Sequence, residues 1–336
     1  MALLNLKTGL KILLSKREVF SLINAANIQS NLLRNNFVDS PKSFIAFSDK
    51  AKGIPLMVPA DEKLFHFDAK DVFTLSKSEI LKIVYNISDE RYVGYKHAFN
   101  ELNFLSKFEV KKDYKPFINR VIKQNSQIEA YVASLKEEFK NIGAFQTRNI
   151  PHFGHELIIQ RLLEVCDHVV INPVIGPKKL GDVTIECLES TYTLLSQTKY
   201  KQKISFKPIF ANMFYAGPRE AMHHALMRQR IGFQHFTIGR DHAGAESVYD
   251  PQDAPELIKQ NIDRLKIQVM VHNGAAFCLE CSKVILIGEC SHSIKSMVDI
   301  SGSDFRSSLK AKSMFNLADL EMQKYLLKSN IEMFEK

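Results

Sequence analysis

Residues 145–156 read Phe-Gln-Thr-Arg-Asn-Ile-Pro-His-Phe-Gly-His-Glu and lie between two segments with different apolar spacing. Residues 141–147, which lead into this stretch, form a short apolar run typical of a buried strand. Residues 156–163, which follow it, carry apolar side chains at helical spacing. We therefore predict a strand that turns into a helix, with His152 and His155 three residues apart on one face of the first helical turn.

This junction favours the binding of an oxyanion. The first turn of a helix has unpaired backbone N–H groups and the positive end of the helix dipole, so it attracts phosphate even without side chains. Gln146 and Arg148 add donors beside the two histidines, and a guanidinium gives a tetrahedral oxyanion two parallel hydrogen bonds that a lysine cannot reproduce. His-x-x-His by itself would favour a helix cap, a core feature or a pair of metal ligands, and the neighbouring Gln146 and Arg148 shift the balance toward an anion site.

The following sequence alternates strands with helices. Short apolar strands are expected at 168–171, 204–209, 235–238 and 268–271, and helices at 184–195 and 219–231. This order predicts parallel βα units in a Rossmann-like α/β domain. Because ligands collect at the carboxyl ends of parallel strands, the segments containing Gln146, Gly176, Tyr215 and Gly239 are expected to meet in one site.

Several segments carry a family resemblance. They are Gln-Thr-Arg-Asn at 146–149 with His-Phe-Gly-His at 152–155, and the runs 176–182, 215–221, 239–244, 249–254 and 300–306. In this order they resemble the motifs of the ATP sulfurylases, the sulfate adenylyltransferases, and Gly-Arg-Asp-His-Ala-Gly at 239–244 matches residue for residue. The resemblance implies a nucleotidyltransferase domain that uses ATP, sulfate and Mg²⁺.

The resemblance also implies roles for individual residues. Sulfate would be held by Gln146, Arg148 and the backbone N–H of Ala243. The residues expected to contact ATP are His152, His155, Gly239, Arg240, Asp241 and His242. The residues expected to act in catalysis are Thr147, Arg148, Asn149, His152 and His155. Attack of sulfate on the α-phosphorus needs no protein nucleophile, so these groups would position the reactants and neutralise charge.

Departures from the family pattern leave alternatives open. The family has proline directly after the asparagine and arginine between the histidines, whereas this chain has Ile150 and Phe153. A nucleotidyltransferase that uses another oxyanion or acid is one alternative, and a non-catalytic descendant that binds RNA is another. The net charge of +8 would suit nucleic acid, but the lysines are spread widely and ATP and sulfate are also anions, so nucleic acid is the weaker prediction.

The cysteines predict a reducing, cytoplasmic location and a metal site. The chain has five cysteines and no export-like apolar start. Cys278, Cys281, Cys290 and His292 have the spacing of a zinc ribbon, in which four ligands hold a structural Zn²⁺ in tetrahedral geometry. His292 is the ligand that the pattern defines least well, and buried free cysteines are the alternative. The other two cysteines are expected in the core.

Three segments summarise the predicted organisation. Residues 1–125 read as a β-rich region that the resemblance identifies as PUA-like, residues 126–275 as the nucleotidyltransferase domain, and residues 276–336 as the zinc ribbon with a helical C-terminal segment. No apolar run approaches the twenty residues of a membrane span, and no Gly-x-x-x-x-Gly-Lys-Ser/Thr loop indicates a fused kinase. The family resemblance also suggests a homo-oligomer.

Overall fold

The computed structural model describes residues 115–335 except 176–180, 211, 212, 214, 241 and 244–247, and before them residues 2–5, 11–14, 57–60, 63–66 and 87. In the first part, strand β1 (Ala2–Asn5) pairs antiparallel with β2 (Lys11–Leu14), and β3 (Met57–Ala60) pairs antiparallel with β4 (Lys63–His66). The predicted PUA-like region otherwise lies outside the described residues.

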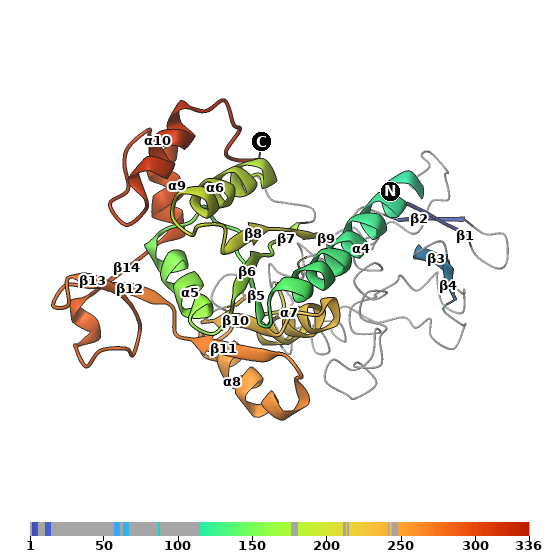
Figure 1. Ribbon diagram of the computed structural model, residues 1–336, viewed down its shortest axis with the longest axis horizontal. Helices are drawn as coiled ribbons and strands as arrows, with labels where there is room; N and C mark the ends of the chain where they lie inside the picture. Colours follow the sequence, from blue (N-terminus) through green and yellow to red (C-terminus); the bar gives the residue numbers. More distant parts are fainter. Residues whose placement is uncertain are drawn as a thin grey trace.

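A five-stranded parallel sheet forms the centre of the described chain (Figure 1). Its strands are β5 (Ile142–Phe145), β6 (His168–Ile171), β8 (Ile204–Phe206), β10 (His235–Gly239) and β11 (Gln268–His272). The spatial order is β11-β10-β5-β6-β8, and each neighbouring pair is parallel. If these five strands are numbered along the chain and read from β8 to β11, the order is 3-2-1-4-5. This order confirms a Rossmann-like α/β fold and puts the topological switch point beside β5.

One strand prediction needs correction. The apolar run 204–209 is not a single strand, because the backbone leaves the main sheet after Phe206. The next strand, β9 (Ile209–Phe210), instead pairs in parallel with β7 (Val174–Ile175). Lys207 and Pro208 separate the two strands, and proline cannot donate a ladder hydrogen bond, which favours a break at this position.

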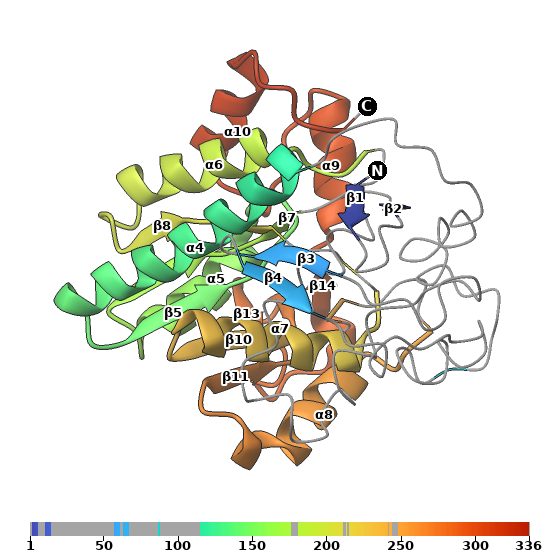
Figure 2. The same cartoon turned by 90° about the vertical axis from the view of Figure 1, so that its right-hand side faces the viewer.

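Helices cover both faces of the sheet (Figures 1 and 2). Helices α4 (Lys115–Glu138), α7 (Pro218–Ile231) and α8 (Asp253–Gln260) pack on one face, and α5 (Phe153–Leu163) and α6 (Ile185–Thr198) on the other. Successive strand residues alternate between these layers. In β6, Val170 belongs to the first core cluster, whereas Val169 and Ile171 belong to the second. Burial on both faces explains why the strand sequences are apolar throughout.

The C-terminal helices complete the second layer. Helix α9 (Gly302–Lys310) and helix α10 (Leu320–Lys328) pack beside α6. Phe305 and Leu309 of α9 and Met322 and Leu326 of α10 are buried in the same cluster as α5 and α6. Leu320, at the start of α10, is instead 50% exposed. The C-terminal helices therefore share a core with the sheet.

A small three-stranded antiparallel sheet projects next to α5 (Figure 1). Strand β12 (Ala275–Cys278) lies between β13 (Lys283–Leu286) and β14 (Met297–Asp299). Short 3₁₀ turns, η5 (Ile262–Arg264) and η6 (Ile294–Ser296), precede β11 and β14. Within the described part of the chain, no helix combines the length and apolar character needed to cross a bilayer.

Candidate functional site

A pocket of about 310 Å³ opens at the carboxyl ends of β5, β10 and β11. Its location agrees with the rule that parallel α/β sheets bind ligands where the strand order reverses. Polar side chains and backbone from five separate segments converge there. The pocket is lined by Phe145, Gln146, Thr147, Arg148, Asn149, His155, Ile158, Val174, Asp182, Met213, Tyr215, Thr237, Gly239, Arg240, His242, Ala243 and His272.

Most of the residues predicted from the sequence lie at this pocket. The members that line it are Gln146, Thr147, Arg148, Asn149, His155, Gly239, Arg240, His242 and Ala243. Asp241 and the loop 176–180 lie outside the described residues. His152 is the one described member of the predicted set that does not line the pocket wall.

His152 caps the helix instead. Its backbone is extended, and its Nδ1 accepts a hydrogen bond from the N–H of His155 at 3.4 Å, as an N-cap side chain does. The rings of His152 and His155 lie 3.8 Å apart between centroids, and His152 is only 7% exposed. A Cβ on Gly154 would approach the His152 ring to 3.1 Å. His152 thus helps to position His155, through the cap hydrogen bond and the contact between the two rings.

The pocket imidazoles are uncharged at neutral pH. Burial lowers the pKa of His155 and of His242 well below the usual value, and the neighbouring histidines lower it further. A neutral imidazole carries one N–H donor and one acceptor. His155 Nδ1 has no hydrogen-bond partner among the described residues although it is buried, and buried polar atoms without partners point to a ligand or an ordered water.

A row of buried, hydrogen-bonded polar side chains orients Gln146, and these residues were not predicted from the sequence. His224 Nε2 lies 3.5 Å from Glu220 Oε1, and because a carboxylate only accepts, the proton of His224 belongs on Nε2. His224 Nδ1 is then an acceptor for Gln146 Nε2 at 3.0 Å and His242 Nε2 at 3.1 Å. The amide nitrogen of Gln146 therefore faces His224, and one further N–H of that nitrogen remains for a ligand.

Helix α7 supplies this chain and holds it rigidly. Glu220 and His224 are one helical turn apart and almost fully buried. Arg228, one turn further, is also fully buried and donates to both the side-chain and main-chain oxygens of Asn172 at 2.9 and 2.8 Å. The guanidinium also stacks on Phe236. The sequence signal for these residues is their spacing of four after Gly217, which places Glu220, His224 and Arg228 on one face of the helix.

The C-terminal segment packs against Asn149, a residue of the pocket wall. Arg306 of α9 donates to Asn149 Oδ1, and a Cβ on Gly302 would lie 3.1 Å from the Asn149 amide. Desolvation and the neighbouring Arg148 guanidinium lower the pKa of Arg306. Two arginines held close together favour a bound anion, since an anion would relieve their repulsion.

Arg240 lies at the end of β10 and reaches the small sheet. Its Nη2 lies 3.0 Å from Asp299 Oδ1 on β14. Both side chains are partly exposed, so the pair contributes little to stability, but it directs the guanidinium along the pocket rim.

Two non-glycine residues of the pocket have left-handed backbone. Tyr215 has φ +59° and Ala243 has φ +55°, a conformation that costs a non-glycine residue about 1 kcal/mol or more. Such strain clusters at ligand sites. Gly217 N–H donates to the Ala243 carbonyl at 3.2 Å and holds these two turns together.

Phe153, the main departure from the family pattern, does not line the pocket. The ammonium of Lys199 lies 5.5 Å from the centre of the Phe153 ring. Lys199 also forms an ion pair with the buried Glu156. The aromatic side chain therefore lies beside Lys199, directly after α6, and outside the pocket lining.

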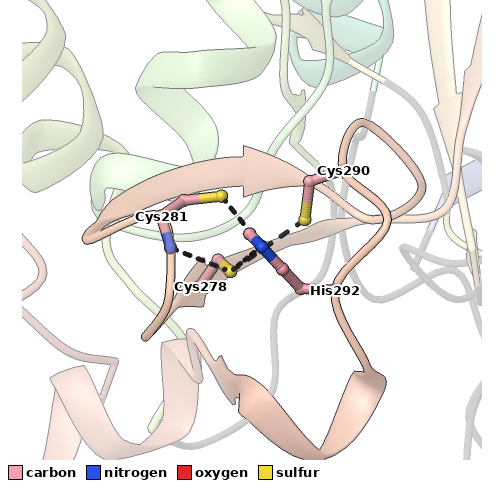
Figure 3. Close-up of side chains that lie close together, drawn as sticks. All are labelled: Cys278, Cys281, Cys290 and His292. Atoms are coloured by element: carbon pink, nitrogen blue, oxygen red, sulfur yellow. Dashed lines mark hydrogen bonds between the residues drawn. The ribbon is translucent and has the colours of Figure 1, made fainter.

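The cysteine cluster forms a second site on the small sheet (Figure 3). Ligand atoms of Cys278, Cys281, Cys290 and His292 lie within 4.8 Å of one another. His292 Nδ1 is 3.4 Å from Cys278 Sγ and 3.2 Å from Cys281 Sγ, and the sulfurs of Cys290 and Cys278 are 3.9 Å apart. A tetrahedral ion with bonds of about 2.3 Å to sulfur separates its ligands by roughly 3.8 Å. The cluster thus has the size of a four-coordinate metal site.

The remaining cysteines are core residues, as expected. Cys166 and Cys187 are buried and belong to the apolar cluster between the sheet and α6. Burial raises the pKa of the Cys166 thiol to about 12, which makes it unreactive.

The parallel sheet and the donor-rich pocket at its carboxyl edge define an α/β protein with a pocket suited to an anionic ligand. The chain belongs to the ATP-sulfurylase family, whose sequence model matches residues 121–315.

Curated relatives support this placement. The chain is 32% identical over 256 residues to the sulfate adenylyltransferase of Pyrococcus abyssi, covering 75% of this chain and 66% of that protein. It is 32% identical over 249 residues to the sulfate adenylyltransferase of Persephonella marina, covering 72% and 64%. The chain thus spans about two thirds of the length of these relatives.

Among solved structures, the chain is similar to a hexameric APS kinase from Thiobacillus denitrificans. The TM-score is 0.46 at 12% identity, with 61% of this chain and 39% of that chain covered. A likeness of this extent carries no conclusion about function.

Proposed function

We propose that this chain is a sulfate adenylyltransferase, which joins ATP and sulfate to give adenosine 5′-phosphosulfate and pyrophosphate. The observation that carries the proposal is the convergence of Gln146, Arg148, Asn149, His155 and Arg240 on one pocket in a chain of the ATP-sulfurylase family. The curated relatives bear this activity as their name.

The reaction is a direct displacement. A sulfate oxygen forms a bond to the α-phosphorus of ATP while the bond between that phosphorus and the bridging oxygen breaks, and pyrophosphate leaves with those electrons. No proton transfer is needed, so the protein contributes position and charge. Arg148 is exposed at the pocket and is assigned to sulfate, together with the free N–H of Gln146 and the backbone of Ala243.

The assigned ATP contacts come from the other side of the pocket. His155 supplies a neutral N–H group, and Arg240 supplies charge at the rim. The single N–H of the neutral His242 ring donates to His224, which leaves His242 Nδ1 as an acceptor. Asn149, held by Arg306, is assigned to orient the α-phosphoryl group. His152 acts on ATP indirectly in this assignment, by capping the turn that carries His155.

The pocket residues and the Cys/His cluster suit different metal ions. Mg²⁺ prefers oxygen ligands, and Asp182 is the one carboxylate among the described pocket residues, so Mg²⁺ is proposed to enter on the phosphates of ATP. Zn²⁺ suits the three sulfurs and one imidazole nitrogen of the Cys/His cluster. His292 Nε2 lies 3.6 Å from Glu280 Oε2, an outer carboxylate of the kind that orients metal-bound histidines.

The test is molybdate-dependent cleavage of MgATP to AMP and pyrophosphate by zinc-loaded protein, with sulfate as competitor. Molybdate is a tetrahedral oxyanion whose mixed anhydride with AMP hydrolyses spontaneously, so the reaction does not stall on its product. We expect AMP release that sulfate inhibits. Absence of AMP release from folded protein would refute the proposal, and AMP release that sulfate does not inhibit would indicate a different acceptor.

A further inference from the structure

His272 is a third histidine of the pocket, and it belongs to none of the motifs that carry the family resemblance. It is the last residue of β11 and lines the pocket together with His155 and His242. It lies close enough to both for its charge to affect their pKa values. Three imidazoles from β11, α5 and the turn after β10 thus face one cavity.

The tautomer of His272 is determined by the backbone. The N–H of Gly274 donates to His272 Nδ1 at 3.2 Å, and a backbone N–H can only donate, so Nδ1 must be unprotonated. Burial also lowers the pKa of His272 to about 4, so the ring is neutral at physiological pH. The single proton of the ring is therefore on Nε2, which makes Nε2 a hydrogen-bond donor.

The neighbouring strand leaves room for this ring. His272 is the register partner of Gly239 at the end of β10. A Cβ on Gly239 would lie 2.7 Å from His272 Cε1, closer than real Cβ contacts. Glycine at position 239 therefore permits the imidazole to lie across the strand end, where it contributes to the pocket wall.

The surroundings of His272 suit an anion better than a neutral group. Arg148 and Arg240 line the same pocket, and Asp182 is the one carboxylate among its described lining residues. Neutral imidazole N–H groups bind phosphoryl oxygens without the desolvation cost of a buried charge. We propose that His272 is a further nucleotide-binding residue, whose Nε2–H donates to a phosphoryl oxygen of ATP. This rests on the proposed function only for the presence of ATP in the pocket.

The experiment compares equilibrium binding of MgATP by calorimetry, which needs no turnover. His272→Phe keeps a ring but no donor. His272→Asn keeps an acceptor near Gly274 but does not reach the position of Nε2, whereas His272→Gln places an amide N–H there. We expect Kd for MgATP to rise about tenfold or more in the Phe and Asn variants and less than about threefold in the Gln variant.

His235→Phe is the matched control. His235 is the first residue of β10, at the opposite end of the sheet, and does not line the pocket. Its replacement should leave Kd for MgATP unchanged. Thermal unfolding of each variant shows whether it is folded, and the Asn variant serves if the Phe variant does not fold.

Two results would overturn the role of His272. The first is wild-type affinity for MgATP in the folded Phe or Asn variant. The second is an equal loss of affinity for adenosine, which has no phosphate and would place the contact on the base or ribose. MgATP binding by the wild type without molybdate-dependent AMP release would refute the proposed function alone and leave the His272 comparison intact.

Discussion

Replacement of Gly217 by alanine should destabilise the protein strongly, because two costs coincide there. Gly217 is the N-cap of α7 with φ +51° and ψ −118°, a conformation that side-chain-bearing residues rarely adopt. A Cβ at this position would lie 2.4 Å from Cδ2 of the Tyr249 ring. Tyr249 is itself buried in the core cluster that contains α7, so its ring cannot move away freely.

The expected magnitude follows from these two terms. The backbone conformation costs about 1–3 kcal/mol for alanine, and overpacking against Tyr249 adds about 1–3 kcal/mol. The Gly217→Ala variant should therefore lose about 4 kcal/mol of unfolding free energy. Gly288→Ala is the matched control, since Gly288 also has positive φ, at +101°, but a Cβ there would meet nothing within 4 Å. It should show the backbone cost alone.

Urea unfolding of zinc-loaded wild type and both variants measures the difference. A loss in Gly217→Ala that exceeds the Gly288→Ala loss by about 1–3 kcal/mol would support the steric argument. Equal losses in the two variants would refute it. The Gly217 change should also reduce AMP release at permissive temperature, since α7 carries the Glu220 and His224 pair that orients Gln146.

Three further predictions concern the pocket and the metal site. Arg148→Lys should lower molybdate-dependent turnover by at least about tenfold despite the retained charge, because the bidentate geometry is lost; near-normal turnover would remove Arg148 from the oxyanion site. Burial lowers the pKa of His152 from 6.5 to about 4, so the unfolded chain binds the extra proton between these values. The contribution of His152 to the unfolding free energy should therefore be full above pH 6.5 and fall by roughly 2 kcal/mol at pH 5, in addition to the losses from the other buried histidines, whose pKa values are also lowered. In urea titrations, His152→Asn should reduce the pH dependence by this amount, and an unchanged dependence would contradict the assignment. Chelation of zinc-loaded protein, or Cys290→Ser, should lower Tm by several degrees in calorimetry, and an unchanged Tm after chelation would contradict metal binding by the cluster.

The α/β class and the order of strands and helices could be predicted because they depend on local spacing. Strand β6 was predicted with its observed ends, and α7 began one residue earlier than expected. The split of residues 204–210 between two sheets could not be read from the apolar run, because pairing partners lie far away in sequence.

The four residues of the Cys/His cluster could also be predicted from the sequence. Its four residues lie within fifteen positions of the chain, and the structure brings their ligand atoms together in the predicted set. A hairpin turn of few residues leaves little freedom for other arrangements, so the spacing determined most of the geometry.

The chain sequence by itself determined which residue types were available and where the strand-to-helix junction lies. It indicated an oxyanion site because Gln146, Arg148 and the histidines are adjacent along the chain. Only the tertiary structure decided that His152 caps the helix instead of lining the pocket. It also decided that His272 lines the pocket, and that Glu220 and His224 lie behind Gln146. The physical reason is that local spacing is encoded over a few residues, whereas the pocket joins segments that are distant in the chain, such as Gln146 and His224, which are 78 positions apart. Only close packing of both faces of the sheet determines which of these side chains meet.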